Sequence, residues 1–341
     1  MSIVFKKIKT RARIINPFKG FSIDEIPLEI RFDPLTGQTG RIFDLPFKPV
    51  RPDVSDVVRR SEESFCPFCP EALEKSTPLF PEDVIPEGRV AVGEATLIPN
   101  LMPFDKYAGV AILSHKHYLP IEDLDPKRMI DAFSACLVFI KRVAEMDPKV
   151  NFFNINWNYM PPAGSSIVHP HLQPNCGEVP TNEQRLQMEG CTTYYEQTGN
   201  SFWLDFMDAE KEKQERYVGE IGSTFWAMNY VPQVFLPDVW CIFAEQASLI
   251  DWGREDLDDF LEGLSRVIRY FGLNDILSFN VSVFSVRKDE HFRMNAKICP
   301  RLFPRPIGNS DMAYLQAIHR EAFVVRPPEA VCQELRNVFM G

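Results

Sequence analysis

Two stretches of this chain carry the same order of apolar patterns, and this internal repeat limits the folds that the chain can adopt. Residues 125–146 and 254–272 both read as amphipathic helices, because apolar side chains recur in them at helical spacing. A shift of 127 residues carries the apolar positions of the first helix, Ile130, Phe133, Leu137, Ile140 and Ala144, onto Leu257, Phe260, Leu264, Val267 and Phe271. A repeat of this length predicts two halves of similar fold.

Short segments rich in β-branched and aromatic residues surround both helices and predict strands. Two precede each helix and one follows it: 89–100, 107–114 and 150–159 in the first half, and 223–231, 238–245 and 277–286 in the second. A shift of 126 carries Asn154 onto Asn280, and the same shift carries His169 and His171 onto Asn295 and Lys297. We therefore expect an α+β chain with two similar halves, of which only the first has the pair His169 and His171.

The segments outside the repeat give weaker signals. Residues 14–65 are rich in Pro, Gly and charged side chains, which predicts short strands and turns rather than helices. Regular structure is expected to begin near Val90. The polar region 176–220 reads as a helical excursion or a linker between the halves.

Charge and hydropathy exclude several classes of protein. The net charge is −10, and no run of Lys and Arg forms a basic patch, so nucleic acid is not an expected partner. No segment has the length of a membrane-spanning helix, and the N-terminus lacks the apolar core of a signal peptide. We expect a cytoplasmic protein, whose eight cysteines do not form a disulfide framework.

The stretch "PPAGSSIVHPHLQPN", residues 161–175, carries the chemistry of the first half. In an extended segment His169, His171 and Gln173 point to the same side. A carbonyl that accepts the proton of one imidazole nitrogen leaves the other nitrogen free to attack phosphorus. Donors for a phosphate precede the histidines: Gly164, Ser165 and Ser166. The competing interpretation is a surface loop with two satisfied histidines.

Cys66 and Cys69 have the spacing at which two thiolates bind one tetrahedral metal. His115, His117 and His169 are available as further ligands. A redox pair and two inert cysteines are the alternatives, but a redox pair normally opens a helix in a thioredoxin-like unit.

These motifs together resemble the galactose-1-phosphate uridylyltransferase branch of the histidine-triad superfamily. "NYMPPAGSSIVHPHLQ" matches its active-site segment without gaps at Asn158, Gly164, Ser166, His169, Pro170, His171 and Gln173. "FDPLTGQ", "CPFCPE", "PNLMPFDKY" and "RPPEAVCQELR" look like further segments of that family. The resemblance implies two histidine-triad-like halves fused in one chain, each an antiparallel sheet with a packed helix. We place them at residues 1–190 and 191–341.

The resemblance also implies the roles of individual residues. His171 would attack the α-phosphorus of a nucleotide sugar and hold the nucleotidyl group until a phosphorylated acceptor takes it. Gln173 and Ser166 would stabilise the phosphoryl oxygens, with Gly164 and Ser165 beside them. Asn158 would hold the substrate's phosphates, and Asn100 would lie near the nucleoside. A homodimer is an expected assembly.

A structural zinc ion is the implied cofactor. The resemblance assigns it to Cys66, Cys69, His117 and His169, with His115 as the alternative third histidine. The family's second metal site is expected to be missing, because Arg293 and Asn295 stand where it has a pair of histidines.

Departures from the family keep two further functions open. Ala317 and Phe323 stand where the family contacts the hexose, which leaves room for a non-catalytic nucleotide-binding protein. Leu172 within "HPHLQ" resembles the dinucleoside-polyphosphate phosphorylases, which use the same covalent step with inorganic phosphate as acceptor. A phosphorylase of such compounds or of nucleotide sugars is therefore the second enzymatic candidate.

Overall fold

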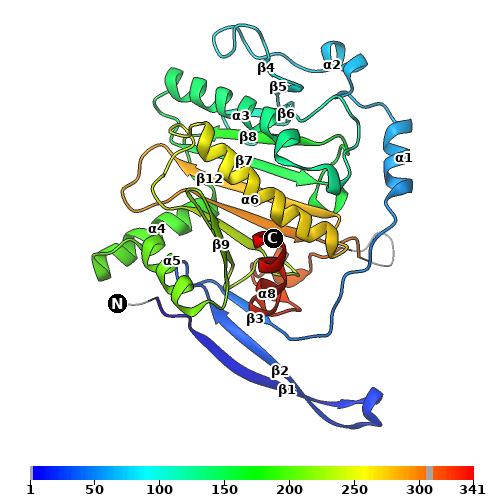
Figure 1. Ribbon diagram of the computed structural model, residues 1–341, viewed down its shortest axis with the longest axis vertical. Coiled ribbons are helices and arrows are strands. Elements are labelled where there is room, and N and C mark those ends of the chain that lie inside the picture. The colour runs from blue at the N-terminus through cyan, green and yellow to red at the C-terminus, as the bar shows by residue number, and fades with distance from the viewer. Residues whose placement is uncertain (1–2, 305–309) are drawn as a thin grey trace.

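The computed structural model describes residues 3–304 and 310–341 of the chain. Within them it contains two β-sheets and eight α-helices (Figure 1). The strands are β1 (Lys7–Asn16), β2 (Ser22–Phe32), β3 (Thr39–Ile42), β4 (Val90–Val92), β5 (Ala95–Pro99), β6 (Tyr107–Ile112), β7 (Phe152–Tyr159), β8 (His171–Gly177), β9 (Tyr217–Ile221), β10 (Thr224–Met228), β11 (Val239–Phe243), β12 (Ser278–Val286), β13 (Asn295–Arg301) and β14 (Ala322–Val324).

The helices alternate with these strands along the chain. They are α1 (Ser55–Glu63), α2 (Pro70–Ser76), α3 (Pro126–Met146), α4 (Asn182–Thr198), α5 (Phe202–Lys213), α6 (Arg254–Leu273), α7 (Tyr314–Ala317) and α8 (Pro328–Met340), with short 3-10 turns η1 (Pro17–Lys19), η2 (Ile121–Asp123) and η3 (Pro161–Ala163). In the part of the chain that the structure describes, no helix combines the length and the apolar character that a bilayer crossing requires.

The ten-stranded sheet confirms the two-fold repeat. Its strand order is β4-β5-β6-β8-β7-β12-β13-β11-β10-β9. Adding five to each strand number of the first half, β4-β5-β6-β8-β7, gives β9-β10-β11-β13-β12. This is the second half of the sheet read in the opposite direction, so the two halves have the same topology. The halves meet where β7 pairs antiparallel with β12, from Phe152 opposite Val286 to Tyr159 opposite Phe279. The fold is thus two similar antiparallel halves joined edge to edge.

The register corrects one detail of the repeat. Asn156 pairs with Gln173 in the first half, and Ser282 pairs with Lys297 in the second. Since Ser282 is Asn156 shifted by 126, Lys297 corresponds to Gln173, and the equivalence of Lys297 with His171 is wrong by two residues. The prediction assumed one shift of 126 residues for both strands of each half. The observed pairing gives 126 residues from Asn156 to Ser282 but 124 from Gln173 to Lys297. The division at residues 190 and 191 stays a prediction, and it falls inside α4.

Helices α3 and α6 pack against each other on the same face of this sheet (Figure 1). Asp125 accepts a hydrogen bond from the backbone N–H of Arg128 and caps α3, with Pro126 in the first turn, as the sequence predicts. Asp256 plays a similar part in α6 by accepting from the N–H of Gly253. The apolar faces of both helices lie in one core with the inward side chains of the strands.

The opposite face of the sheet is polar at its centre. Side chains alternate between faces along a strand, so the neighbours of the core residues point away from the helices. This polar face carries His171, Gln173 and Asn175 on β8, Asn154, Asn156 and Asn158 on β7, Asn280 and Ser282 on β12, and Lys297 on β13. Both halves therefore contribute to one continuous polar surface.

The smaller sheet, ordered β1-β2-β3-β14, joins the two ends of the chain. β14 pairs parallel with β3, and Ile3 and Leu35 pack with residues of the second half. The prediction of turns and short strands for residues 14–65 is wrong in two respects. β1 and β2 form a long hairpin, and α1 is a helix.

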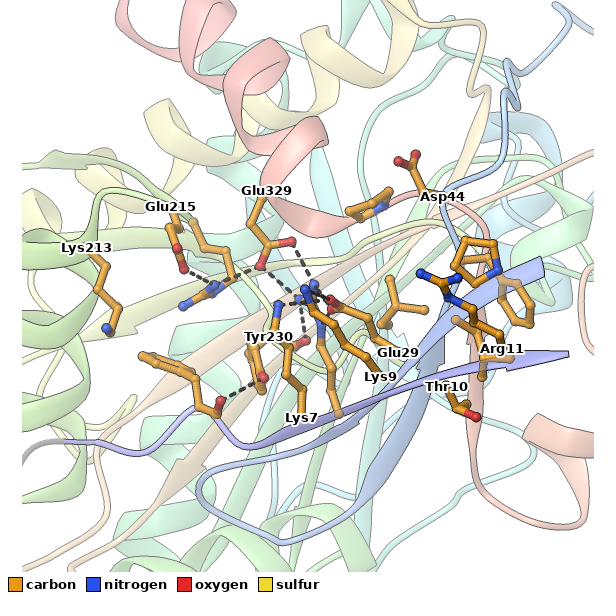
Figure 2. A pocket seen from close by; sticks show the side chains of 18 residues that line it. Lys7, Lys9, Thr10, Arg11, Glu29, Asp44, Lys213, Glu215, Tyr230 and Glu329 are labelled. Atoms are coloured by element: carbon orange, nitrogen blue, oxygen red, sulfur yellow. Dashed lines mark hydrogen bonds and ion pairs between the residues drawn. The ribbon is translucent and has the colours of Figure 1, made fainter. Parts of the chain in front are cut away.

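Buried ion pairs hold the base of this hairpin to the second half. Glu329 of α8 accepts two hydrogen bonds from Arg31 of β2, at 2.9 Å each, and one from Arg216 at 2.8 Å (Figure 2). Burial alone would raise the pKa of Glu329, but the two guanidinium groups outweigh it and lower the pKa to about 2. These residues line a cavity of about 690 Å³, in which Arg31 pairs with Glu29 and Arg216 pairs with Glu329.

We predict that Glu329→Gln destabilises the protein by about 3 kcal/mol at neutral pH, because it removes the carboxylate that two buried guanidinium groups share. The folded pKa lies below the ordinary value of 4.5. The difference in unfolding free energy between wild type and variant should therefore be full above pH 4.5 and shrink as the pH falls toward 2. Urea unfolding at a series of pH values measures it.

The matched control is Glu63→Gln, which removes a carboxylate from an exposed ion pair with Arg59. Exposed pairs contribute little, so this change should cost less than about 1 kcal/mol at every pH. A Glu329→Gln effect that is equally small, or that does not change with pH, would contradict the prediction.

Candidate active site and metal centre

The loop between β7 and β8 carries the histidine motif, and its backbone is held in an unusual conformation. Met160 is buried and has φ 68°, a value that side-chain-bearing residues rarely adopt. Gly164, with φ 88°, ends η3. Such conformations persist where the surroundings hold them, and they cluster at functional sites.

The second half supplies that support. Asn280 of β12 donates through one side-chain nitrogen to Asn158 Oδ1 at 2.7 Å and to the carbonyl of Ala163 at 2.8 Å. Arg301 donates to Asn280 Oδ1 at 3.0 Å, and Asp311 in turn binds Arg301. Asn280 and Arg301 were missed as site residues from the sequence, where Asn280 marked only the repeat. The contacts of Asn280 with the loop span 117 and 122 residues, and contacts of that length leave no local pattern.

His171 opens β8 and is 5% exposed. Its Nδ1 lies 2.8 Å from the carbonyl oxygen of His169, which only accepts, so Nδ1 carries the proton and Nε2 is free. Gln173 Nε2 lies 3.5 Å from that free nitrogen. Burial lowers the pKa of His171 and keeps the imidazole neutral. The geometry is that of a nucleophile beside an amide donor.

The other residues predicted to bind the substrate differ in their position relative to His171. Trp157 of β7 pairs with Leu172 of β8. One step further along the two strands, Asn158 lies opposite His171. Ser166 and Gly164 are exposed, whereas Ser165 donates to the carbonyl of Ile167 at 2.7 Å. Asn100 follows β5, and its backbone N–H donates to the carbonyl of Ala108 on β6. Ala108 lies four residues along β6 from Ile112, which pairs with His171, so Asn100 is roughly 13 Å from His171.

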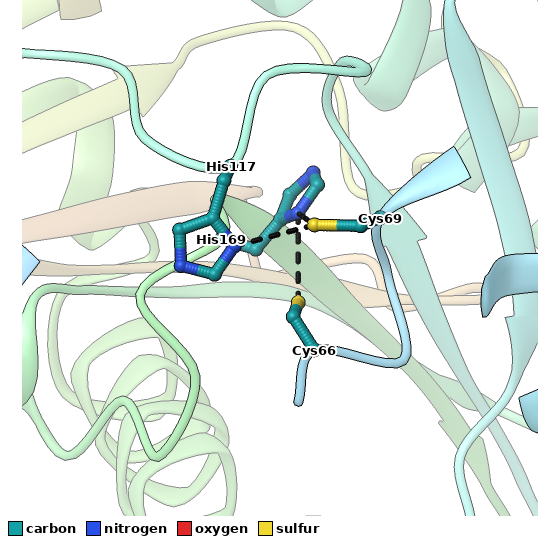
Figure 3. Close-up of side chains that lie close together, drawn as sticks. All are labelled: Cys66, Cys69, His117 and His169. Carbon is teal, nitrogen blue, oxygen red and sulfur yellow. Dashed lines mark hydrogen bonds between the residues drawn. The ribbon is translucent and has the colours of Figure 1, made fainter. Parts of the chain in front are cut away.

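The predicted metal ligands converge from three separate segments, the loop with both cysteines and the segments that carry His117 and His169. One ligand atom from each of Cys66, Cys69, His117 and His169 lies within 4.8 Å of all the others (Figure 3). His115 is exposed and outside this group, so the structure brings His117 rather than His115 to the cysteines. The Cys66 loop precedes α2, and Phe68 between the cysteines packs edge-on against both ring systems, His169 and His171.

The cluster fits a tetrahedral zinc ion. His169 Nδ1 lies 3.7 Å from each of the two sulfurs, and His117 Nδ1 lies 3.3 Å from Cys69 Sγ. Zinc bound at its usual bond lengths sets sulfur and nitrogen ligands about 3.6 Å apart. Both rings thus present Nδ1 to a common centre.

Hydrogen bonds outside the cluster hold the two rings in this orientation. His169 Nε2 donates to the carbonyl of Ser114, and His117 Nε2 lies against the hydroxyl of Ser61, both at 2.8 Å. Burial lowers the pKa of His169 to about 4 and raises that of Cys69 to about 12, with the neighbouring Cys66 adding to the second shift. A divalent cation would favour the thiolates and neutral imidazoles that bind it.

In the second half Lys297, the counterpart of Gln173, takes part in a buried ion pair. Lys297 Nζ lies 2.5 Å from Glu183 of α4 and over the ring of Trp240. Burial would lower the pKa of Lys297, but Glu183 outweighs it and raises the pKa. Among the described residues, only Cys66, Cys69, His117 and His169 bring three or more possible metal-ligand atoms close enough together to hold one ion.

We predict that His117→Ala lowers the affinity for Zn²⁺ at least about 100-fold, because it removes one of four ligands. The protein would be dialysed against graded chelator, and its zinc content measured by mass spectrometry of the metal.

His115→Ala is the matched control, since His115 is exposed two residues away and should leave zinc binding unchanged. Equal zinc loss in both variants, or retention in both, would contradict the assignment of His117.

Comparisons with known proteins agree with this architecture. No family model matches the chain. An uncharacterised protein of Archaeoglobus fulgidus is 32% identical over 322 residues, which cover 94% of this chain and 95% of that protein. A GalT-like protein of Arabidopsis thaliana has a similar structure, with a TM-score of 0.65, 16% identity and coverage of 90% of this chain and 98% of that one.

A second solved structure is equally similar. It is an ADP-glucose phosphorylase of Arabidopsis thaliana with bound ADP-glucose, with a TM-score of 0.65 and 17% identity. The match covers 91% of this chain and 98% of that one. At this identity the likeness establishes the fold.

Proposed function

We propose that this chain is a nucleotidyltransferase of the galactose-1-phosphate uridylyltransferase-like branch of the histidine-triad superfamily, and that it acts on a nucleotide sugar. The chain belongs to the same family as the uncharacterised archaeal protein, to which it is 32% identical. The observation that carries the proposal is the free Nε2 of His171, whose other ring nitrogen is held by the carbonyl of His169. A binding protein has no need of a buried, oriented and unprotonated nucleophile beside an amide donor.

In the first step His171 Nε2 attacks the α-phosphorus of the nucleotide sugar. A P–N bond forms, the P–O bond to the β-phosphate breaks, and the sugar 1-phosphate leaves with that electron pair. In the second step a phosphate oxygen of the acceptor attacks the same phosphorus and the P–N bond breaks. The enzyme is regenerated, which gives ping-pong kinetics.

Three groups would stabilise the charge that develops on the phosphoryl oxygens. Gln173 is the donor nearest to the attacking nitrogen, at 3.5 Å. Gly164 and Ser166 offer donors from the exposed part of the loop, and donors fixed before the reaction act most strongly in a water-poor site. Asn158, oriented by Asn280, would hold the next phosphate, and Asn100 would meet the nucleoside.

The zinc ion, when bound, would be structural, because its four positions are all filled by protein ligands. Its effect on the reaction would pass through the backbone. Holding the His169 ring orients the His169 carbonyl, and that carbonyl fixes the proton on His171 Nδ1.

Phosphorolysis is the second candidate, with inorganic phosphate as the acceptor of the same nucleotidyl group. The likeness to the ADP-glucose phosphorylase favours it. Leu172 does not, because it is fully buried in the core on the face opposite His171 and cannot touch an acceptor.

We predict that a nucleotide sugar adds a nucleotidyl group to the intact protein, visible by mass spectrometry, and that His171→Ala abolishes the adduct. The adduct mass identifies the nucleoside monophosphate. Chasing the adduct with inorganic phosphate or with a hexose 1-phosphate then separates phosphorylase from transferase.

His115→Ala again serves as control and should label like wild type. If wild type forms no adduct with any nucleotide sugar or dinucleotide yet binds them, the non-catalytic nucleotide-binding protein is the better description.

We also predict that Gln173→Ala slows adduct formation by about 10²-fold, because one donor to the phosphoryl oxygens is lost. The dissociation constant of the nucleotide sugar should change far less than the rate. Single-turnover kinetics measures both, and a change confined to binding would contradict the role of Gln173.

A further inference from the structure

The side chain of Asn158 is bonded at one end only. Asn158 Oδ1 accepts a hydrogen bond from Asn280 Nδ2 at 2.7 Å, whereas Asn158 Nδ2 has no hydrogen-bond partner among the described residues. The residue is partly exposed on the polar face of the sheet, where it lies opposite His171. Its N–H donors are therefore free on the face that carries the nucleophile.

An amide side chain can turn end for end, and such a turn would replace the donors at its free end by an acceptor. A turned Asn158 would offer a carbonyl oxygen to a phosphate, and two negatively polarised oxygens repel each other. Asn158 thus supports or opposes phosphate binding according to which end of its amide is held by Asn280.

The hydrogen bonds of Asn280 fix that choice from two directions. Arg301 Nη1 lies 3.0 Å from Asn280 Oδ1, and a guanidinium group only donates, so the atom of Asn280 that faces it is the oxygen. The carbonyl oxygen of Ala163 lies 2.8 Å from Asn280 Nδ2 and only accepts. Both neighbours require the nitrogen of Asn280 to face the loop, so Asn158 must present its oxygen to Asn280.

Asp311 holds Arg301 in the position that these bonds need. Its carboxylate accepts from Arg301 Nη2 at 2.5 Å and from Nε at 2.9 Å, and it also accepts from the backbone N–H of Leu302 at 3.0 Å. The side chains of Arg301 and Asp311 are 13% and 5% exposed, so the pair is screened little by solvent ions. The chain of bonds from Asp311 through Arg301 and Asn280 to Asn158 is called the relay here.

A neighbouring amide on the same strand is bound differently. Asn156, two residues before Asn158 on β7, accepts from the hydroxyl of Ser282 at 2.9 Å and donates to the carbonyl of Gln173 at 3.1 Å. Both ends of its amide are thus bonded within the protein. Of these two aligned amides, Asn158 is the one that keeps donors free for a ligand.

We propose that Arg301 and Asp311 are positioning residues, which act through Asn280 to keep the N–H donors of Asn158 available to the substrate's phosphate. The consequence for catalysis rests on the nucleotidyl transfer proposed above, in which Asn158 holds the phosphate next to the one under attack. Two hydrogen bonds separate Arg301 from Asn158, so the ion pair reaches the site without touching the substrate.

A first measurement needs no substrate. In the full chain with isotopically labelled asparagine, NMR should show the side-chain amide protons of Asn280 exchanging with water at least about tenfold more slowly than those of Asn158, because only the former are bonded. Arg301→Met/Asp311→Leu removes the ion pair without leaving a lone buried charge, and it should remove most of this protection. Asn158→Ala and Asn280→Ala assign the signals. Equal exchange of the two amides in wild type overturns the proposal.

The second measurement is the rate of adduct formation at limiting nucleotide sugar. We expect Asn158→Ala, Asn280→Ala and Arg301→Met/Asp311→Leu each to lower it about tenfold, because each removes the same donor from the phosphate. Added to Asn158→Ala, the other substitutions should change the rate less than about twofold, since the relay acts only through Asn158. Arg301→Lys keeps a donor and a partner for Asp311, and it should stay within about threefold of wild type.

Arg326→Met/Glu334→Leu is the matched control. It removes another ion pair of the second half, with 2.6 Å between its charged atoms, and Glu334 bonds to Tyr270 rather than to the histidine loop. Both the rate and the amide exchange should be unchanged. Losses that multiply when the pair substitution is combined with Asn158→Ala overturn the proposal, because the ion pair would then act independently of Asn158. A wild type without any adduct contradicts the nucleotidyl transfer instead, and amide exchange alone then decides the relay.

Discussion

The pairing of β7 with β12 is the interaction on which the rest of the structure depends. Eight residues of each strand form this ladder, and every other strand of the large sheet is placed relative to it. Separated halves would each expose a long strand edge, which is a template for aggregation. Joining them edge to edge removes both edges, lets α3 and α6 share one core, and makes one polar surface out of two.

That surface explains why a half that lacks the His-Pro-His motif matters to a site that lies in the other half. The second half orients the histidine loop through Asn280 and Arg301, at the side nearest the central ladder. The cysteine loop holds His169 from the opposite side. His171 lies between these two supports with one ring nitrogen committed to the backbone and the other free. Two independent constraints of this kind place a nucleophile more accurately than a loop alone would.

Local signals in the sequence were enough for much of this. The helical spacing locates α3, the repeat locates α6, and the Cys-x-x-Cys and His-Pro-His motifs contain three of the four side chains that meet as candidate metal ligands. Prediction failed for the hairpin of β1 and β2, for α1 and for the register of β13. The register of β13 is decided by its pairing with β11 and β12 and not by the spacing of residues within β13 itself.

The sequence by itself determined the order of elements and the chemical groups available to the site, because each pattern lies within about 20 residues, and the recurrence of these patterns revealed the two-fold repeat. Only the tertiary structure decided which groups meet. It brings His117 rather than His115 to the cysteines, sets Asn280 against the histidine loop, pairs Lys297 with Glu183 and ties Arg31 to Glu329. The reason is physical: a buried charge or donor needs a partner, and the partner is selected by packing rather than by position in the chain.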